Sequence, residues 1–299
     1  MNLAIVTPHF NPAGYDNPAY NLRQFIRAAS SQLDANDLYF AYARFPGDHH
    51  NPPSGNLLLH EATDSNLMWQ KEALINSAIK QLPSDYDAVA WVDGDLLFGN
   101  PEWYHQTALA LETHKVVQCF SYIRYVDHDG RESKLKKSAS LLPEATGWQV
   151  PGGAIAVKRD FFDNHHLYDK HILGGGDQVF MNACLDLSGR IFRKLTGTWR
   201  EYVESYMASV RDWAGKDVHT IPGTVTHLWH GSRTRRRYQE RHVVLMRRQY
   251  NPNTDVRVSR NGLLDWNSDN EPLQRSARDY FLQRKEDTPR PDDVFENHV

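Results

Sequence analysis

The chain has little cysteine and no long apolar run, and these absences exclude whole classes of protein. Cys119 and Cys184 are the only cysteines among 299 residues, and neither lies in a CxxC pair, so a disulfide framework is excluded. We expect both to be buried thiols of a reducing compartment. No apolar run approaches the roughly 18 residues of a membrane-spanning helix, and no Asn-x-Ser/Thr sequon occurs. We therefore expect a cytoplasmic protein without a transmembrane segment.

The chain also lacks a strong excess of either charge. Its formal net charge is −3, with 24% charged and 40% hydrophobic residues. This balance argues against a surface broadly tuned for nucleic acid or an anionic membrane, and it leaves a local basic patch possible. The N-terminal residues 1–8 carry no basic side chain and only a short apolar run, which predicts a strand and not a signal peptide.

The first 120 residues alternate between strand-like and helix-like segments. Short apolar runs predict strands at 3–7, 38–42, 57–59, 87–92 and 116–120. Apolar spacing of three to four residues predicts helices at 18–31, 67–82 and 101–112. This alternation predicts an α/β fold with a mixed, mostly parallel sheet covered by helices on both faces. Such sheets bind ligands at the carboxyl ends of their strands.

The second half is less regular. We expect a hairpin around 127–130, strands at 154–157, 218–221 and 225–229, and helices at 177–187, 198–214, 233–249 and 271–285. The helix at 233–249 is strongly basic, which is typical of a solvated face or of a phosphate-binding surface. No linker separates domains, so we expect one domain over residues 1–285. The acid- and proline-rich tail, 286–299, is predicted to be disordered.

The acidic triplet Asp93-Gly94-Asp95 directly follows the apolar strand at 88–92. Residues two apart in an extended chain point to the same side, so both carboxylates can face one ligand. A diphosphate leaving group needs a divalent cation held by oxygen atoms, and Gly94 would let it approach the backbone. A second triplet, 127–129, has no strand before it and Gly130 after it, which predicts a turn.

A pair of histidines, His227 and His230, lies late in the chain just before Gly231. Neutral imidazole beside carboxylates suits Mn²⁺ and similar ions. On a continuous strand these two side chains would face opposite sides, so both can bind one ion only if the chain turns between them. The glycine places a bend just after His230, which favours His230 as a ligand and leaves His227 open.

Three glycines, 174–176, precede Asp177 at the start of a predicted helix. One interpretation is an aspartate that caps the helix after a flexible turn. The other is a carboxylate that accepts the proton of an acceptor hydroxyl group. Spacing alone leaves both interpretations open.

The order of these motifs resembles the β-1,4-galactosyltransferase-type enzymes of the glycosyltransferase family 2-like superfamily. The stretch 69–76, followed by 85–87 and the triplet 93–95, is similar to the donor half of these enzymes. Residues 151–157, through Phe161 and Phe162 to 174–177, resemble their C-terminal glycosyltransferase module. His227 and His230 match the position of their late metal ligands. The resemblance covers roughly residues 65–235 and is greatest to the soluble bacterial and phage proteins.

The resemblance implies a GT-A fold, which is the Rossmann-like fold of nucleotide-diphospho-sugar transferases. Residues 1–120 would bind a UDP-sugar-type donor, and 121–285 would bind the acceptor. The implied metal is Mn²⁺ (or Mg²⁺), held by Asp95 and His230, with Asp93 and His227 as further candidates. The implied base is Asp177, as in inverting enzymes, and related retaining enzymes leave the stereochemistry open. The expected donor contacts are Thr7, Pro8, Lys71, Asp93, Gly152 and Gly153.

The acceptor is open at this stage: a glycan, a lipid-linked glycan, or a hydroxymethylated DNA base gripped by the 233–249 helix. Two other classes of function also remain. One is a noncatalytic module that binds a nucleotide or sugar. The other is a metal-dependent nucleotidyltransferase, which the lack of lysine and arginine from Thr7 to Gly14 disfavours.

Overall fold

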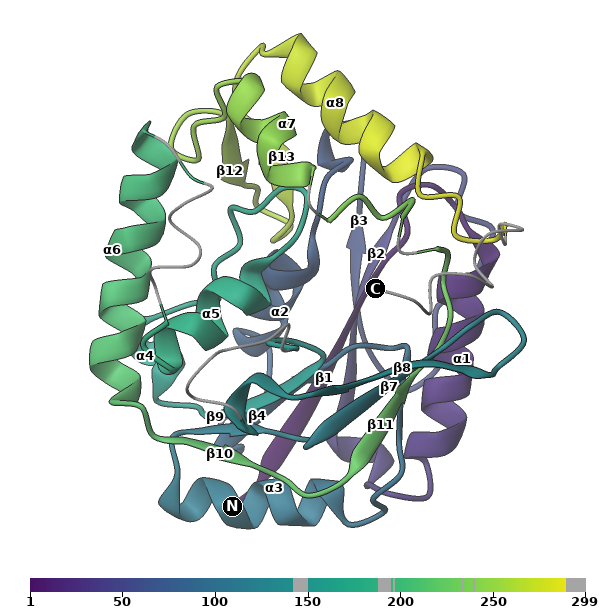
Figure 1. Cartoon of the computed structure of the whole chain (residues 1–299), viewed down its shortest axis with the longest axis vertical. Coiled ribbons are helices and arrows are strands. Elements are labelled where there is room, and N and C mark those ends of the chain that lie inside the picture. The colour runs from purple at the N-terminus through teal and green to yellow at the C-terminus, as the bar shows by residue number, and fades with distance from the viewer. Residues whose placement is uncertain (142–149, 188–194, 196, 233, 239, 289–299) are drawn as a thin grey trace.

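The centre of the computed structural model is a seven-stranded sheet (Figure 1). The structure describes residues 1–141, 150–187, 195, 197–232, 234–238 and 240–288. The strands lie in the order β10 (Val218–Thr220), β6 (Val116–Gln118), β9 (Ala154–Lys158), β4 (Ala88–Val92), β1 (Leu3–Phe10), β2 (Leu38–Arg44) and β3 (Asn56–Glu61). Strand β9 runs antiparallel to both of its neighbours, and the other pairs are parallel. The predicted mixed, mostly parallel sheet is confirmed.

The two faces of this sheet bury two separate cores. In β1 the side chains of Leu3 and Ile5 enter one core, and those of Ala4 and Val6 enter the other, because successive residues of a strand point to opposite faces. The first core is covered by α1 (Asp16–Ala29) and α3 (Trp103–Thr113). The second is covered by α2 (Lys71–Ile79), α5 (Gly176–Cys184), α6 (Gly197–Ala214), α7 (Arg241–Arg247) and α8 (Glu271–Leu282), with the short α4 (Phe161–Asn164). Helices on both faces are therefore confirmed.

A smaller four-stranded sheet adjoins the acidic triplet. Its order is β5 (Leu96–Phe98), β11 (Thr224–His227), β7 (Tyr122–Val126) and β8 (Glu132–Lys137). The antiparallel pair β7–β8 confirms the hairpin predicted around 127–130. Strand β5 and the separate hairpin of β12 (Val256–Val258) and β13 (Leu264–Trp266) were not predicted. The first residue of β5 follows Asp95 directly, which ties the triplet to this second sheet.

The predicted basic helix over 233–249 is wrong for most of its length. Helix α7 covers only Arg241–Arg247. Arg237 adopts a left-handed backbone with φ of 49°, which no α-helix accommodates. Arg236 is buried, and its guanidinium group donates to the carbonyl of Gly231 at 3.3 Å. Positions 233 and 239 lie outside the described residues.

The predicted helix over 67–82 is shorter at both ends, because α2 covers Lys71–Ile79. A 3₁₀ turn precedes it at Asp64–Asn66. The backbone N–H of Trp69 donates to the carbonyl of Ile172 at 2.9 Å, so this segment bonds across to the loop before the three glycines. That bond places the start of α2 beside the start of α5.

Glu286 and Asp287, at the start of the tail predicted to be disordered, contact the rest of the chain. The Asp287 carboxylate accepts from the backbone N–H groups of Asp16 and Asn17, at 2.9 and 2.8 Å, and so caps α1. Glu286 is 6% exposed. The remaining tail, 289–299, lies outside the described residues.

Two further predictions concern cysteine and the membrane. Cys119 and Cys184 are buried and unpaired, as expected. Among the described residues, no helix combines the length and the apolar character needed to cross a membrane.

Candidate metal and donor site

A pocket opens at the carboxyl ends of β1 and β4, the edge of the sheet at which a ligand was expected. Segments far apart in the sequence line it: the end of β1 and the loop into α1, the acidic triplet, the turn after β11, and the segment after α8. The lining residues include Pro8, Phe10, Asn21, Trp69, Lys71, Asp93, Gly94, Asp95, His227, His230, Tyr238, Phe281, Arg284 and Glu286.

Strand pairing explains how Asp95 meets both histidines. In the β5–β11 pair, His227 lies opposite Leu96, which places it beside Asp95. Strand β11 ends at His227, and the backbone N–H of Leu228 then donates to the carbonyl of Asp95 at 2.8 Å. The chain turns here, so His230 reaches the same carboxylate. The distances from Asp95 Oδ2 to the Nε2 atoms of His230 and His227 are 2.9 and 3.5 Å.

The remaining nitrogen of each histidine, Nδ1, faces an oxygen atom that can accept the ring proton. His227 Nδ1 is 2.9 Å from the carbonyl oxygen of Leu228, and His230 Nδ1 is 3.3 Å from Glu286 Oε1. Both oxygens can only accept, and so can the Asp95 carboxylate that faces Nε2. A metal ion on Nε2 would leave the proton of each neutral ring on Nδ1, where these oxygens accept it. Burial lowers the pKa of His227 to about 4, which keeps this ring neutral.

A cation fits this donor set. Burial alone would raise the pKa of Asp95, but His227, His230 and Arg236 hold it well below its ordinary value, so the carboxylate is ionised. Its Oδ1 is buried and has no hydrogen-bond partner among the described residues. Burial opposes protonation of His230, whereas Glu286 and Asp95 raise its pKa overall, so a proton and a metal ion would compete for Nε2. One carboxylate and two imidazoles suit a divalent transition-metal ion such as Mn²⁺.

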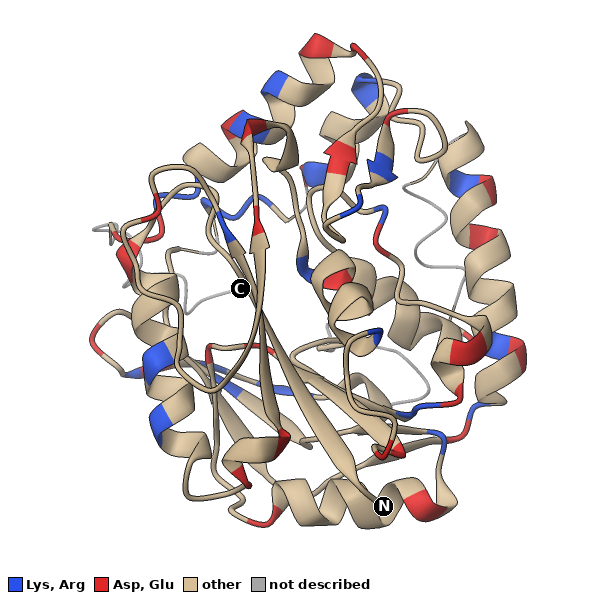
Figure 2. Cartoon of the chain, turned by 180° about the vertical axis from the view of Figure 1, so that it is seen from behind, with Lys and Arg blue, Asp and Glu red and all other residues tan. Residues whose placement is uncertain are grey.

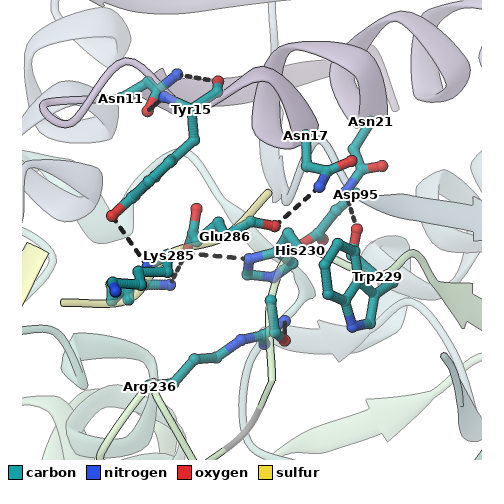
Figure 3. A network of polar contacts seen from close by, with 12 residues as sticks. Asn11, Tyr15, Asn17, Asn21, Asp95, Trp229, His230, Arg236, Lys285 and Glu286 are labelled. Carbon is teal, nitrogen blue, oxygen red and sulfur yellow. Dashed lines mark hydrogen bonds and ion pairs between the residues drawn. The ribbon is translucent and has the colours of Figure 1, made fainter. Parts of the chain in front are cut away.

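Glu286 was missed by the sequence, and it orients His230 (Figure 3). Burial would raise the pKa of Glu286, but Arg284, at 2.5 Å, and His230 lower it to about 2. Asn17 donates to the backbone carbonyl of Glu286 at 2.8 Å. Gly231 has φ of 95°, and a Cβ there would lie 2.9 Å from the Glu286 Cα. Glycine at position 231 therefore lets the segment after α8 approach the turn that contains His230.

Replacing Glu286 by glutamine should weaken Mn²⁺ binding about 10- to 100-fold, the usual cost of losing the outer partner of a metal-bound histidine. The amide keeps the shape of the side chain but not the charge that holds His230 Nδ1. Calorimetric titration of Mn²⁺ into the metal-stripped chain measures the change. The matched control is Asp287→Asn, because that carboxylate bonds the start of α1 instead. Equal Mn²⁺ affinity in Glu286→Gln and the wild type would show that Glu286 does not act on His230.

A second polar group centres on Lys71. Its Nζ lies 2.5 Å from Asp93 Oδ1 and 2.6 Å from Asp177 Oδ2, and the side chain is 5% exposed. Burial would lower the pKa of Lys71, but Asp177 and Asp93 raise it well above its ordinary value. Burial raises the pKa of Asp93 to about 7, although Lys71 opposes this. The Asp93 carboxylate thus faces Lys71, and Asp95 is the member of the triplet that meets the histidines.

Asp177 lies in the first turn of α5, behind the pocket. Its Oδ2 contacts Lys71, and its Oδ1 accepts from the indole N–H of Trp91 at 3.3 Å. Its side chain is 18% exposed. Glu72, also missed by the sequence, is buried beside it and accepts from Trp69 Nε1 at 2.9 Å. Lys71 is therefore the link between the pocket and Asp177.

At the two glycines expected to contact the donor, an added side chain would meet protein atoms. A Cβ on Gly152 would collide with the Asp177 carboxylate, and one on Gly153 would lie 3.3 Å from Leu96. Gly94 lines the pocket, and a Cβ there would lie 2.9 Å from Leu22 of α1, so the close approach at this position is made by α1.

Pro8 and Thr7 were also expected to contact the donor. Pro8 lines the pocket. Thr7 is fully buried, and its hydroxyl has no hydrogen-bond partner among the described residues. The structure therefore places Pro8, Lys71 and Asp93 at the pocket surface.

Comparison with known proteins gives matches among solved structures alone. No family model and no curated protein matches the chain. A crystal structure of the catalytic domain of Drosophila β1,4-galactosyltransferase 7 with xylobiose is 14% identical, with a TM-score of 0.38, over 73% of this chain and 64% of that chain. A mutant of that enzyme with manganese, UDP-Gal and xylobiose is 14% identical, with a TM-score of 0.40, over 79% of this chain and 74% of that chain.

A third match is 4-diphosphocytidyl-2C-methyl-D-erythritol synthase from Anaerococcus prevotii. It is 11% identical, with a TM-score of 0.36, over 74% of this chain and 87% of that chain. The chain thus spans slightly less than two thirds of the first galactosyltransferase structure. These matches include the enzyme type that the motifs resemble.

Proposed function

We propose that this chain is a metal-dependent glycosyltransferase that moves a sugar from a UDP-sugar-type donor to an acceptor hydroxyl group. The observation that carries the proposal is the convergence of Asp95, His227 and His230, with atoms that could hold one ion all within 4.8 Å of one another. This group lies at the carboxyl ends of the central strands, in the same pocket as Lys71 and Arg284. A metal ion and cationic side chains both suit the negative charge of a nucleoside diphosphate.

The pocket offers different surfaces for the two ends of such a donor. Phe10, Trp69 and Phe281 line one part, with the rings of Phe10 and Trp69 edge to face at a centroid distance of 5.0 Å. A flat nucleobase is suited to pack against these rings. A divalent cation held by Asp95, His227 and His230 would stabilise the negative charge of the departing diphosphate. Lys71 would add a fixed positive charge between donor and acceptor sides.

In the transfer step, the acceptor oxygen forms a bond to the anomeric carbon of the sugar. The bond from that carbon to the diphosphate oxygen breaks, and the diphosphate leaves with the electron pair. The proton of the acceptor hydroxyl passes to the Asp177 carboxylate, which acts as the base. Lys71 contacts Asp177 and Asp93 at once, so it holds the base in register with the donor site.

A saccharide or lipid-linked glycan is the acceptor that we favour over a modified DNA base. The DNA alternative relied on a continuous basic helix at 233–249, which does not form. Arg236 is buried, and Arg237 pairs with Glu240. Acidic and basic residues are interspersed along the ribbon (Figure 2). These arrangements do not favour a phosphate grip on this segment.

Salt dependence separates the two acceptors. With a glycan acceptor, we expect the transfer rate to change little between 50 and 200 mM salt, because the acceptor carries no row of phosphates. A protein that contacts six to ten DNA phosphates loses roughly 10³- to 10⁵-fold in affinity over that range. A steep fall of transfer with salt would favour the DNA acceptor and contradict the preference for a glycan.

The proposed function is tested by a panel of nucleotide sugars incubated with the chain and Mn²⁺. We expect Mn²⁺-dependent release of nucleoside diphosphate from one donor, lost when EDTA is added. Thermal stabilisation by nucleotide sugars without any release or transfer would indicate a binding module. Release of pyrophosphate from a nucleoside triphosphate and a sugar phosphate would indicate a nucleotidyltransferase. Either of the last two results would contradict the proposal.

A further inference from the structure

A second group of metal-ligating side chains lies apart from the Asp95 site. Asp16 is in the first turn of α1, and His49 and His50 are in the loop after β2. The Nε2 atoms of His49 and His50 lie 3.2 and 3.0 Å from the same oxygen, Asp16 Oδ1. The two rings lie 4.0 Å apart between centroids. Two imidazole nitrogens and a carboxylate oxygen thus meet at one point, all within 4.8 Å of one another.

A buried carboxylate fixes one of these histidines from behind. Asp48 Oδ1 lies 2.9 Å from His50 Nδ1, and its side chain is 2% exposed. The Asp48 carboxylate also accepts from the Tyr42 hydroxyl at 3.1 Å and from the His50 backbone N–H at 3.0 Å. Carboxylates face both nitrogens of His50, and an ion on Nε2 would leave the ring proton on Nδ1, where Asp48 accepts it. Histidines that bind metal ions usually have such a carboxylate on their other nitrogen.

The same arrangement occurs at the Asp95 site, where Glu286 holds His230 Nδ1 and Nε2 faces Asp95. An exposed ion pair alone contributes little stability and needs no buried carboxylate behind it. We propose that Asp16, His49 and His50 form a second binding site for a divalent transition-metal ion that prefers imidazole, such as Zn²⁺. Two nitrogen ligands and one oxygen favour this class of ion over Mg²⁺ or Ca²⁺.

The position of the site, between the loop after β2 and the start of α1, indicates what a bound ion would do to the structure. The side chains of Asp16 and His49 are 77% and 64% exposed, so water can complete the coordination. A bound ion would join the loop after β2 to the start of α1. Tyr15 and Pro18, on either side of Asp16, line the donor pocket. The ion would therefore stiffen one wall of that pocket, and the site itself does not depend on the proposed glycosyltransferase activity.

The test is a titration of the metal-stripped full-length chain with Zn²⁺ in competition with a chromophoric chelator. Asp16→Asn and His49→Gln change exposed side chains and should leave the fold intact, which circular dichroism checks. The His227→Ala/His230→Ala background removes both imidazole ligands of the first site, so the remaining Zn²⁺ is counted at the second. In that background we expect one equivalent of Zn²⁺, and either added substitution should weaken it at least about tenfold.

The matched control is His114→Gln with His219→Gln in the same background, since these rings also stack, at 4.6 Å, elsewhere in the fold. It should keep the equivalent of Zn²⁺. Three results would overturn the proposal: no Zn²⁺ bound in the His227→Ala/His230→Ala background, a loss of less than about tenfold in Asp16→Asn and His49→Gln, or an equal loss in the control. None of these results tests the proposed glycosyltransferase function. A result against that function would come from the nucleotide-sugar panel instead.

Discussion

The Asp95→Ala variant is expected to lose Mn²⁺-dependent donor binding, with the affinity for a nucleotide sugar in Mn²⁺ reduced by about a hundredfold or more. Loss of an outer-shell partner alone costs roughly 10- to 100-fold in metal affinity, and Asp95 is proposed as a direct ligand. Without its carboxylate, His227 and His230 would offer two neutral nitrogens and no negative charge. Calorimetric titration with Mn²⁺ alone measures metal binding, and titration with donor in the presence of Mn²⁺ measures donor binding.

The chain supplies a matched control for this variant. Asp129 belongs to the other Asp-x-Asp triplet, in the hairpin turn between β7 and β8, where it pairs with Arg131 at 2.9 Å. Asp129→Ala should leave Mn²⁺ and donor affinity unchanged. If Asp95→Ala, folded as judged by its circular dichroism, binds donor in Mn²⁺ as the wild type does, then Asp95 is not a metal ligand.

The Asp177→Asn variant is expected to lose turnover by about 10²- to 10⁴-fold, the usual contribution of a general base. Asparagine has nearly the same shape and keeps an oxygen that can accept from Lys71 or Trp91, but it cannot take the acceptor proton. The donor dissociation constant in Mn²⁺ should stay within a few-fold of the wild type. Single-turnover transfer and equilibrium donor binding separate these two quantities.

Two comparisons make the Asp177 result interpretable. Asp186 follows α5 and pairs with Lys216 at 3.0 Å. Asp186→Asn should therefore change neither the turnover nor the donor dissociation constant. Lys71→Met should weaken donor binding, because it removes the cation that contacts Asp93. If Asp177→Asn weakens donor binding as Lys71→Met does, Asp177 only positions Lys71. A near-normal turnover would also exclude the base assignment.

The central sheet and one half of the proposed metal site follow from local sequence. Alternate side chains of β4 enter opposite cores, so the apolar run at 88–92 identifies a fully buried strand. Asp93 and Asp95 then lie at its carboxyl end, the edge at which sheets of this kind bind ligands. Local sequence also separates this triplet from the one at 127–129, which has no strand before it.

The partners of Asp95 depend on pairing between distant segments. Strand β5 has three residues, too few for a periodic signal, and its register with β11 brings His227 to Asp95. Sequence spacing therefore predicted two candidate histidines but could not decide that the chain turns between them. The turn is fixed by the Leu228 N–H bond to the Asp95 carbonyl, which joins two segments far apart in the chain.

Glu286 and the 233–249 segment show how composition misleads. Acidic and proline-rich composition predicted disorder from residue 286, yet Glu286 lies between Arg284 and a histidine 56 residues earlier in the chain. The arginine-rich run predicted a continuous helix, yet Arg236 is buried and Arg237 turns the backbone left-handed. Both features follow from tertiary contacts, which residue frequencies do not encode.

The central claim is that Asp95, His227 and His230 hold a metal ion through which a nucleoside diphosphate binds. The most direct measurement is calorimetric titration of UDP into the chain, once with Mn²⁺ present and once with EDTA. The account predicts binding in Mn²⁺ that is at least about tenfold tighter than in EDTA, with the difference abolished in His227→Ala/His230→Ala. Equal UDP affinity in Mn²⁺ and in EDTA would contradict it.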